Sequence, residues 1–114
     1  MHSVFERGRR LLRKKVGQQR IVAFVLRKGK IVAQGFNSYT KTHPRQASLA
    51  KAVGQPKREY LHAEVSALLR APRDSDTLVV IRMDRQENLV CAAPCPVCCL
   101  AIRRFNPNLK VIHT

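Results

Sequence analysis

Apolar residues follow two different spacings along the chain, and their alternation predicts a fold that mixes strands with helices. Short apolar runs rich in β-branched residues predict strands at 21–26, 31–36, 77–81 and 109–113. Apolar residues that recur at helical spacing predict helices at 3–17, 44–53, 60–70 and 98–105. Strands that are joined through helices indicate an α/β or α+β sandwich around a mixed sheet.

Local signals indicate where these elements begin and end. Ser3 and Glu6 form a capping box for the first helix, which we expect to end near Gly17. The tetrapeptide 27–30 predicts a tight turn that joins the first two strands into a hairpin, and Pro44 can start the second helix. The core side chains expected of the helices are Val4, Phe5, Leu11, Leu12 and Val16 in the first, Leu49, Ala50 and Val53 in the second, and Leu61, Val65, Leu68 and Leu69 in the third.

Length and composition are those of one globular unit. The chain has 114 residues, of which 45% are hydrophobic, so we expect a single domain that spans 1–114. No apolar run reaches the ~18–20 residues that a membrane-spanning helix needs. The basic start lacks the apolar segment of a secretory signal, so we expect a cytoplasmic protein. In that compartment the 4 cysteines are better explained as thiols or metal ligands than as disulfides.

Basic residues greatly outnumber acidic ones. Lys plus Arg is 22 and Asp plus Glu is 7, which gives a formal net charge of +15 at pH 7. This excess indicates an anionic partner such as a nucleotide or a nucleic acid. The basic residues are also spread along the chain, as is typical of a solvated basic surface. Charge does not separate a nucleotide from a polynucleotide, because both carry phosphate.

One histidine and two cysteines have the spacing of a metal site. Cys95 and Cys98 are one helical turn apart, so both sulfurs can face one ion, and Pro96 suits the first position of a helix. His62 would be the third ligand, and a zinc ion with three protein ligands keeps a fourth position for water. Glu64 can share this site only if the helix begins close to His62, because residues two apart in a helix point to nearly opposite sides.

Two alternatives remain open for these cysteines. They can form a buried pair, or they can join a closed structural zinc site whose fourth ligand comes from Cys91, Cys99, His43 or His113. The closed site gives Glu64 no role. We expect Cys91 and Cys99 to be ordinary buried or semi-buried thiols, with the Cys99 side chain turned away from the metal.

His-Ala-Glu at 62–64, paired with Pro-Cys-Pro-Val-Cys at 94–98, resembles the signature of the cytidine deaminase superfamily. This superfamily includes cytidine and deoxycytidylate deaminases, tRNA adenosine deaminases and polynucleotide editors. The strand end Gly-Phe-Asn at 35–37 and the segment that follows it are similar to small deaminases of phage type. The resemblance implies a three-layer α-β-α sandwich whose mixed sheet has about four to five strands. It also implies a zinc-dependent hydrolase that converts a cytosine-type base to uracil and releases ammonia.

The resemblance assigns a role to each matching residue. His62, Cys95 and Cys98 would bind Zn²⁺, and Glu64 would move protons from the water to the base. The backbone N–H of Ala63 would hold the carbonyl of the base, and a further residue, Asn37, would orient the sugar. A plain strand-ending turn residue is the alternative for Asn37, because Asn favours turns.

Two departures from the superfamily pattern create further expectations. An extra stretch, 82–92, separates the third strand from the cysteines, so we expect a protruding hairpin placed beside the site. The chain ends after its fourth main strand, where most superfamily members have a fifth. A short sheet edge needs protection, which favours a homo-oligomer.

Three substrate or ligand classes remain open. The first is a free cytosine nucleoside or nucleotide such as dCMP, with Lys41, His43 and Arg45 either forming a phosphate pocket or lying in a solvated loop. The second is single-stranded DNA or RNA, including tRNA, with Tyr39 and Tyr60 as the plausible exposed aromatic residues. The third is a non-enzymatic, zinc-stabilised module that binds nucleic acid.

Overall fold

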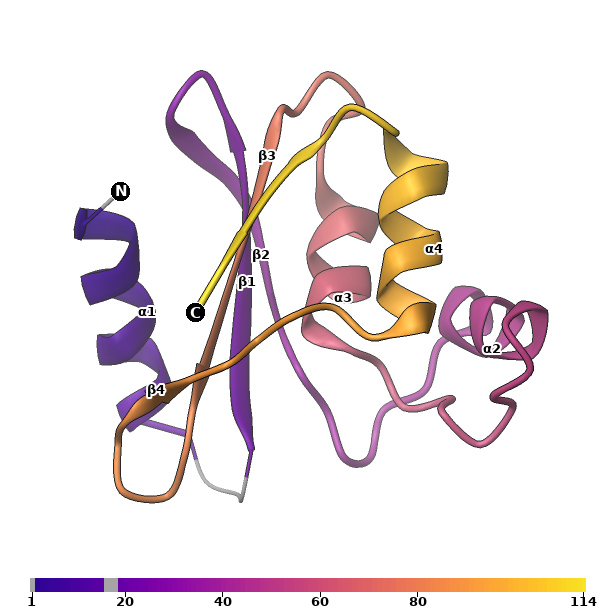
Figure 1. Cartoon of the computed structure of the whole chain (residues 1–114), viewed down its shortest axis with the longest axis horizontal. Coiled ribbons are helices and arrows are strands. Elements are labelled where there is room, and N and C mark those ends of the chain that lie inside the picture. Colours follow the sequence, from indigo (N-terminus) through magenta and orange to yellow (C-terminus); the bar gives the residue numbers. More distant parts are fainter. Residues whose placement is uncertain (1, 16–18) are drawn as a thin grey trace.

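The computed structural model describes residues 2–15 and 19–114, which build a five-stranded mixed sheet between layers of helices (Figure 1). Strand β1 (Arg20–Arg27) lies between β2 (Lys30–Phe36) and β3 (Thr77–Met83), antiparallel to both. The other edge of β3 is shared by two strands. Strand β5 (Lys110–His113) pairs with the first part of β3 in parallel, and β4 (Leu89–Val90) pairs with its end in antiparallel orientation. The predicted mixed sheet is therefore confirmed.

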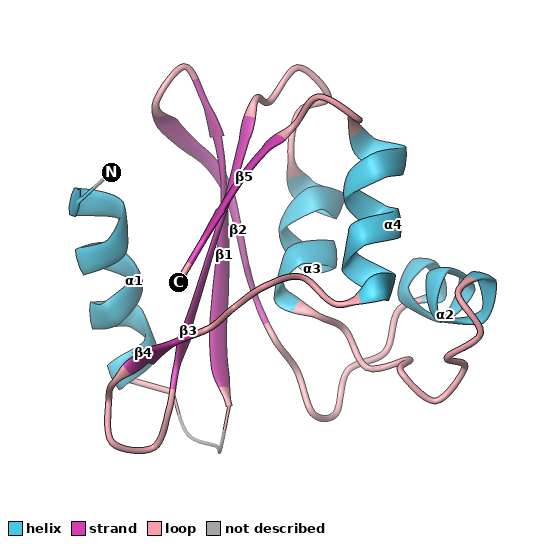
Figure 2. Ribbon diagram, viewed as in Figure 1, coloured by secondary structure: helices cyan, strands magenta, loops and turns pink. Residues whose placement is uncertain are grey.

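Helices cover both faces of this sheet (Figure 2). Helix α1 (His2–Arg13) packs against β1 and β3 on one face. On the other face lie α3 (Ala63–Arg70) and α4 (Pro96–Phe105), with α2 (Pro44–Ala52) packed against α4 at the periphery. This arrangement confirms the expected three-layer α-β-α sandwich.

The central strands read as continuous apolar runs because both of their faces are covered. In β1, Val22 and Phe24 face α1, whereas Ala23 and Val25 face α3 and α4. All four are fully buried. The two resulting core clusters hold the helix layers to opposite sides of one sheet.

The β1–β2 turn has the backbone of a tight hairpin. Lys28 and Gly29 both have positive φ, 50° and 79°, as a two-residue primed turn requires. The carboxylate of Asp76 accepts a hydrogen bond of 2.8 Å from the Lys28 N–H, and this bond is the main reason why the pKa of Asp76 is lowered. The backbone of Asp76 also bonds to Leu26 and Lys110. One residue therefore ties the turn to the starts of β3 and β5.

Two predictions for the first helix are affected by its observed bounds. The helix begins at His2, so Ser3 lies inside its first turn and is not the N-cap. It ends at Arg13, earlier than expected, and the predicted end at Gly17 and the core residue Val16 lie outside the described residues.

The third helix starts later than its apolar pattern indicated. Tyr60 forms an isolated β-bridge with Thr42, and the Leu61 N–H donates to the carbonyl of Lys41, so both residues are extended and the helix begins at Ala63. Leu61 therefore precedes the helix. Leu69, predicted to be in the core, is 41% exposed.

The segment after β3 forms the expected hairpin, and the hairpin is held against the end of α1. The guanidinium of the buried Arg20 donates hydrogen bonds to the carbonyls of Leu12 and Asp84. Arg13 and Glu87 form an ion pair at 3.4 Å. After β4 the chain returns across the edge of the sheet to the start of α4 (Figure 1). Within the described residues, no helix has the length and apolar character needed to cross a membrane.

Gly35 in β2 is the point at which α3 comes closest to the sheet. A Cβ placed there would lie 2.6 Å from the backbone nitrogen of Ala67 and 2.7 Å from the carbonyl oxygen of Ala63. Real Cβ atoms do not approach backbone atoms so closely. Glycine therefore permits the first turn of α3 to rest directly on β2.

We expect Gly35→Ala to lower the free energy of unfolding by about 1–3 kcal/mol, because the added methyl group pushes α3 away from β2. Urea unfolding monitored by circular dichroism measures the loss. Gly29→Asn is the matched control, since nothing lies within 4 Å of a Cβ at that position and Asn tolerates the left-handed backbone. Equal unfolding midpoints for the Gly35→Ala and wild-type proteins would contradict the packing argument.

Candidate metal centre and active site

The structure brings the three predicted metal ligands together at the starts of two helices. His62 immediately precedes α3, Cys95 immediately precedes α4, and Cys98 lies in the first turn of α4. Their ligand atoms all lie within 4.8 Å of one another, with His62 Nδ1 at 3.3 Å from Cys98 Sγ and 3.5 Å from Cys95 Sγ. Tetrahedral zinc with ordinary bond lengths separates a nitrogen from a sulfur ligand by about 3.6 Å. These distances are close to that value, so the three side chains are grouped as the ligands of one zinc ion are.

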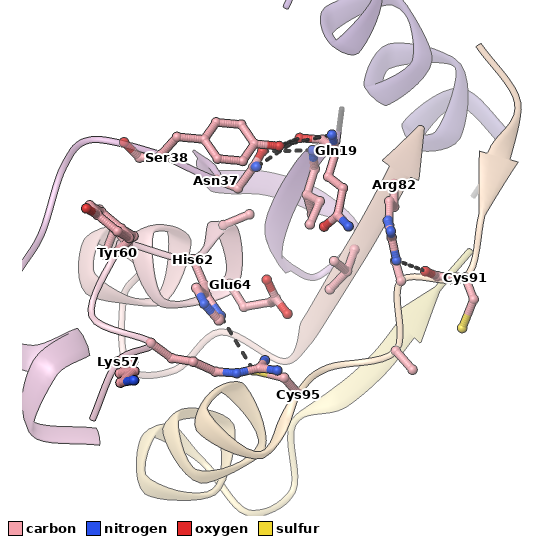
Figure 3. A pocket seen from close by; sticks show the side chains of 18 residues that line it. Gln19, Asn37, Ser38, Lys57, Tyr60, His62, Glu64, Arg82, Cys91 and Cys95 are labelled. Carbon is pink, nitrogen blue, oxygen red and sulfur yellow. Dashed lines mark hydrogen bonds between the residues drawn. The ribbon is translucent and has the colours of Figure 1, made fainter. Parts of the chain in front are cut away.

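The late start of α3 explains how His62 and Glu64 share one site. His62 has an extended backbone, with φ −80° and ψ 153°, so it lies just outside the helix while Glu64 lies within the first turn. Both side chains point into the same pocket (Figure 3). Because His62 and Glu64 are only two residues apart, they can share a site only if a helix starts between them, and the structure has this start at Ala63.

A buried glutamine holds the backbone in front of α3. Gln46 in α2 is fully buried, and its side-chain oxygen accepts a hydrogen bond of 3.2 Å from the His62 N–H. Its side-chain nitrogen donates to the carbonyl of Arg58 at 3.0 Å. Sequence analysis did not single out Gln46. The sequence carried one signal for it. Gln46 lies one turn before Leu49 and Ala50, on the side of α2 that faces the core, where a polar residue is unusual.

The side chains of the two cysteines are coupled by a hydrogen bond that shifts their pKa values in opposite directions. The pKa of Cys95 is lowered to about 3, chiefly because the Cys98 thiol donates a hydrogen bond to its sulfur. The pKa of Cys98 is raised, first by this same bond and then by burial. The hydrogen bond between the two thiol groups therefore favours ionisation of Cys95 over Cys98. Metal binding requires both cysteines as thiolates, so binding releases the protons that remain on the pair.

Glu64 is a buried carboxyl group next to the metal ligands. It is only 6% exposed, and burial is the main reason why its pKa is raised. A carboxyl group whose pKa is shifted toward neutrality can both accept and return a proton. Ala63, fully buried, is the first residue of α3, and the N–H groups of a first helical turn have no acceptor within their helix.

Asn37 lies in the pocket, but its amide is partly occupied by the protein itself. Its Oδ1 accepts a hydrogen bond of 2.9 Å from the Ile21 N–H, and its Nδ2 donates to the Gln19 carbonyl at 3.0 Å. These bonds tie the end of β2 to the start of β1. A second N–H of Nδ2 and a second lone pair of Oδ1 remain for a ligand. A structural role and a substrate-binding role are therefore compatible.

The ligands and Glu64 open into a cavity of about 420 Å³. Its wall includes three cationic side chains that sequence analysis did not select, namely Lys57, Arg58 and Arg82. The segment that returns from the extra hairpin, 91–93, lines the cavity as well, whereas the turn of the hairpin lies against the end of α1 and not beside the site. The sequence did carry two signals for the cations: Lys57 and Arg58 lie shortly before the His62 motif, and Arg82 lies at the end of a predicted strand.

The phosphate pocket considered for Lys41, His43 and Arg45 does not form in this cavity, because none of the three lines it. The His43 ring caps α2 by accepting a hydrogen bond of 3.0 Å from the Arg45 N–H. Tyr39 and Tyr60 are 54% and 46% exposed, as predicted, and both line the cavity.

The remaining cysteines and histidines do not join the metal ligands. Cys91 and Cys99 are exposed, which contradicts the prediction of buried thiols. The Cys99 sulfur lies 3.5 Å from the Pro94 carbonyl oxygen, and the His113 ring bonds to the carbonyl of Thr114. Among the residues that the structure describes, the potential metal-binding group consists of His62, Cys95 and Cys98 alone.

A comparison with protein families agrees with this geometry. The family model described as the cytidine and deoxycytidylate deaminase zinc-binding region matches residues 1–114. No curated protein and no solved structure matches the chain. The family match and the grouped ligands together identify Zn²⁺ as the metal of the site.

We expect Cys98→Ala to weaken zinc binding by more than ~100-fold and to lower stability, because a buried ligand is lost. Zinc content by elemental analysis and thermal unfolding with and without chelator measure the two effects. Cys99→Ala removes the adjacent thiol, which is exposed and outside the ligand group, and should leave both unchanged. Full zinc content in Cys98→Ala would remove Cys98 from the ligand set.

Proposed function

The chain belongs to the cytidine and deoxycytidylate deaminase family, and from this premise we propose that it is a zinc-dependent hydrolytic deaminase that converts a cytosine-type base to uracil. The observation that carries the proposal is a three-ligand metal group with a buried carboxyl group beside it, open to a cavity of about 420 Å³. A zinc ion with three protein ligands has a position left for water.

The proposed reaction exchanges the exocyclic amine of the base for oxygen from water, and ammonia leaves. Zinc, when bound, lowers the pKa of water toward ~7 and makes hydroxide available at neutral pH. Glu64 transfers one proton of the attacking water to the ring nitrogen, and then the second proton of that water to the leaving amine, so that it departs as ammonia. Its burial and raised pKa support this double use. The Ala63 N–H donates a hydrogen bond to the carbonyl of the base, and Asn37 orients the sugar.

We propose a free nucleoside or nucleotide, such as dCMP, as the smallest substrate. The cavity volume lies within the usual range for small-molecule sites, about 300–1,000 Å³. A single-stranded polynucleotide is the second candidate, favoured by the exposed rings of Tyr39 and Tyr60 and by the net charge of +15. The non-enzymatic alternative needs a fourth protein ligand, and in the described part of the chain the group stops at three.

We expect Glu64→Gln to keep zinc and the fold but to lower kcat by about 10²–10⁴, because the amide cannot accept the proton. Ammonia release from cytosine nucleosides, dCMP and short cytosine oligonucleotides measures turnover, and elemental analysis measures zinc. Glu59→Gln makes the same change at an exposed position outside the cavity and should retain activity. Normal deamination by Glu64→Gln would refute the mechanism.

We expect Asn37→Ala to raise KM with zinc content unchanged, because the sugar loses its hydrogen-bond partner. The variant should also lose about 1–2 kcal/mol of unfolding free energy, since the bonds to Gln19 and Ile21 are lost as well. Steady-state kinetics and urea unfolding separate the two effects. Unchanged kinetics in a destabilised variant would leave Asn37 with its structural role alone.

A further inference from the structure

The wall of the active-site cavity carries an excess of positive charge. Lys57, Arg58 and Arg82 line it, and Glu64 is the one carboxylate among its lining residues. None of the three cations takes part in the ion pairs found in residues 2–15 and 19–114. Because Glu64 is buried beside the metal ligands, the cationic groups are left to meet an incoming anion.

Lys57 and Arg82 lie on two sides of the metal ligands. Figure 3 places Lys57 on one side of His62 and Glu64 and Arg82 on the other. Lys57 comes from the segment before α3, whereas Arg82 comes from the end of β3. One guanidinium nitrogen of Arg82 donates to the Cys91 carbonyl at 3.4 Å, and the other N–H groups remain for a ligand.

Two aromatic rings lie at the same cavity with their surfaces in solvent. The hydroxyl of Tyr39 donates to the Gln19 carbonyl at 2.6 Å and accepts from the Gln19 N–H at 3.0 Å, yet the residue is 54% exposed. Its ring is therefore oriented before any ligand binds. Tyr60 is 46% exposed and lies on the same side as Lys57. Exposed rings beside a basic groove are the usual stacking surfaces for unpaired bases.

We propose that the cavity takes its base from within a single-stranded nucleic acid, with Lys57 and Arg58 binding the phosphate on one side of the reacting nucleoside and Arg82 the phosphate on the other. The proposal rests on the deaminase function and extends its substrate. A free mononucleotide carries phosphate on one side only, so it leaves one of the two cationic groups without a partner. A strand also accounts for the overall charge of +15, which a single nucleotide does not require.

Binding to the full, zinc-loaded Glu64→Gln protein tests this proposal without turnover. The three ligands are deoxycytidine, dCMP, and a deoxytrinucleotide with cytosine in the middle, which has a phosphate on each side. The variants are Arg82→Gln, the double variant Lys57→Gln/Arg58→Gln, and the control Arg103→Gln, which changes an exposed cation of α4 outside the cavity.

We expect each site variant to weaken trinucleotide binding by about fivefold or more. One of the two should weaken dCMP, neither should weaken deoxycytidine, and the control should weaken none. The affinity of the trinucleotide should fall with salt at a logarithmic slope of about −1.4 for two neutralised phosphates, reduced to about −0.7 in each site variant. Trinucleotide binding no tighter than dCMP binding, or equal losses for deoxycytidine, would overturn the proposal.

Turnover by the protein with Glu64 intact separates this proposal from the deaminase function. Ammonia release from the trinucleotide with a higher kcat/KM than from dCMP supports both. Equal kcat/KM values for the two would overturn the strand proposal and leave the deaminase intact. If no cytosine ligand releases ammonia, the deaminase function fails, and the binding pattern still decides whether the two phosphate sites exist.

Discussion

The meeting of two helix starts on one face of the sheet is the constraint on which the site depends. Helices α3 and α4 begin next to each other, and this brings His62, Cys95 and Cys98 within 4.8 Å. A helix start also carries partial positive charge, which favours thiolates. Gly35 lets α3 rest on β2, and Gln46 holds the backbone before His62. A shift of either helix would separate the ligands.

The edge of β3 that faces away from β1 shapes one side of the cavity. Strands β4 and β5 share that edge end to end, so the extra hairpin occupies space that a longer partner strand would fill. Arg20 and the Arg13–Glu87 pair hold the hairpin against α1. The chain then returns along the cavity, where the carbonyl of Cys91 holds Arg82. The extra stretch 82–92 thus supplies Arg82, one of the positive charges in the cavity wall, and the carbonyl group that holds it.

Most elements could be predicted because their signals are local. The apolar runs of β1 and β3, the turn at 27–30 and the proline at the start of α2 act over a few residues. The wrong predictions concern residues whose conformation or burial depends on contacts with residues far away in the sequence. Tyr60 has helix-compatible neighbours, but its bridge to Thr42 keeps it extended. Leu69 continues an apolar stripe, but nothing covers it fully, and it remains 41% exposed.

The residues with metal chemistry were determined by sequence alone, because imidazole and thiol groups at this spacing are informative wherever the chain runs. The sequence alone also predicted that a helix starts between His62 and Glu64, because both residues could not otherwise face one site. Only the tertiary structure decided which cations line the cavity. Lysine and arginine occur throughout this chain, so their spacing carries no signal, and the choice of Arg82 over Arg45 depends on which elements pack together. The exposure of Cys91 and Cys99 was decided in the same way, since burial depends on neighbours that lie far away in the sequence.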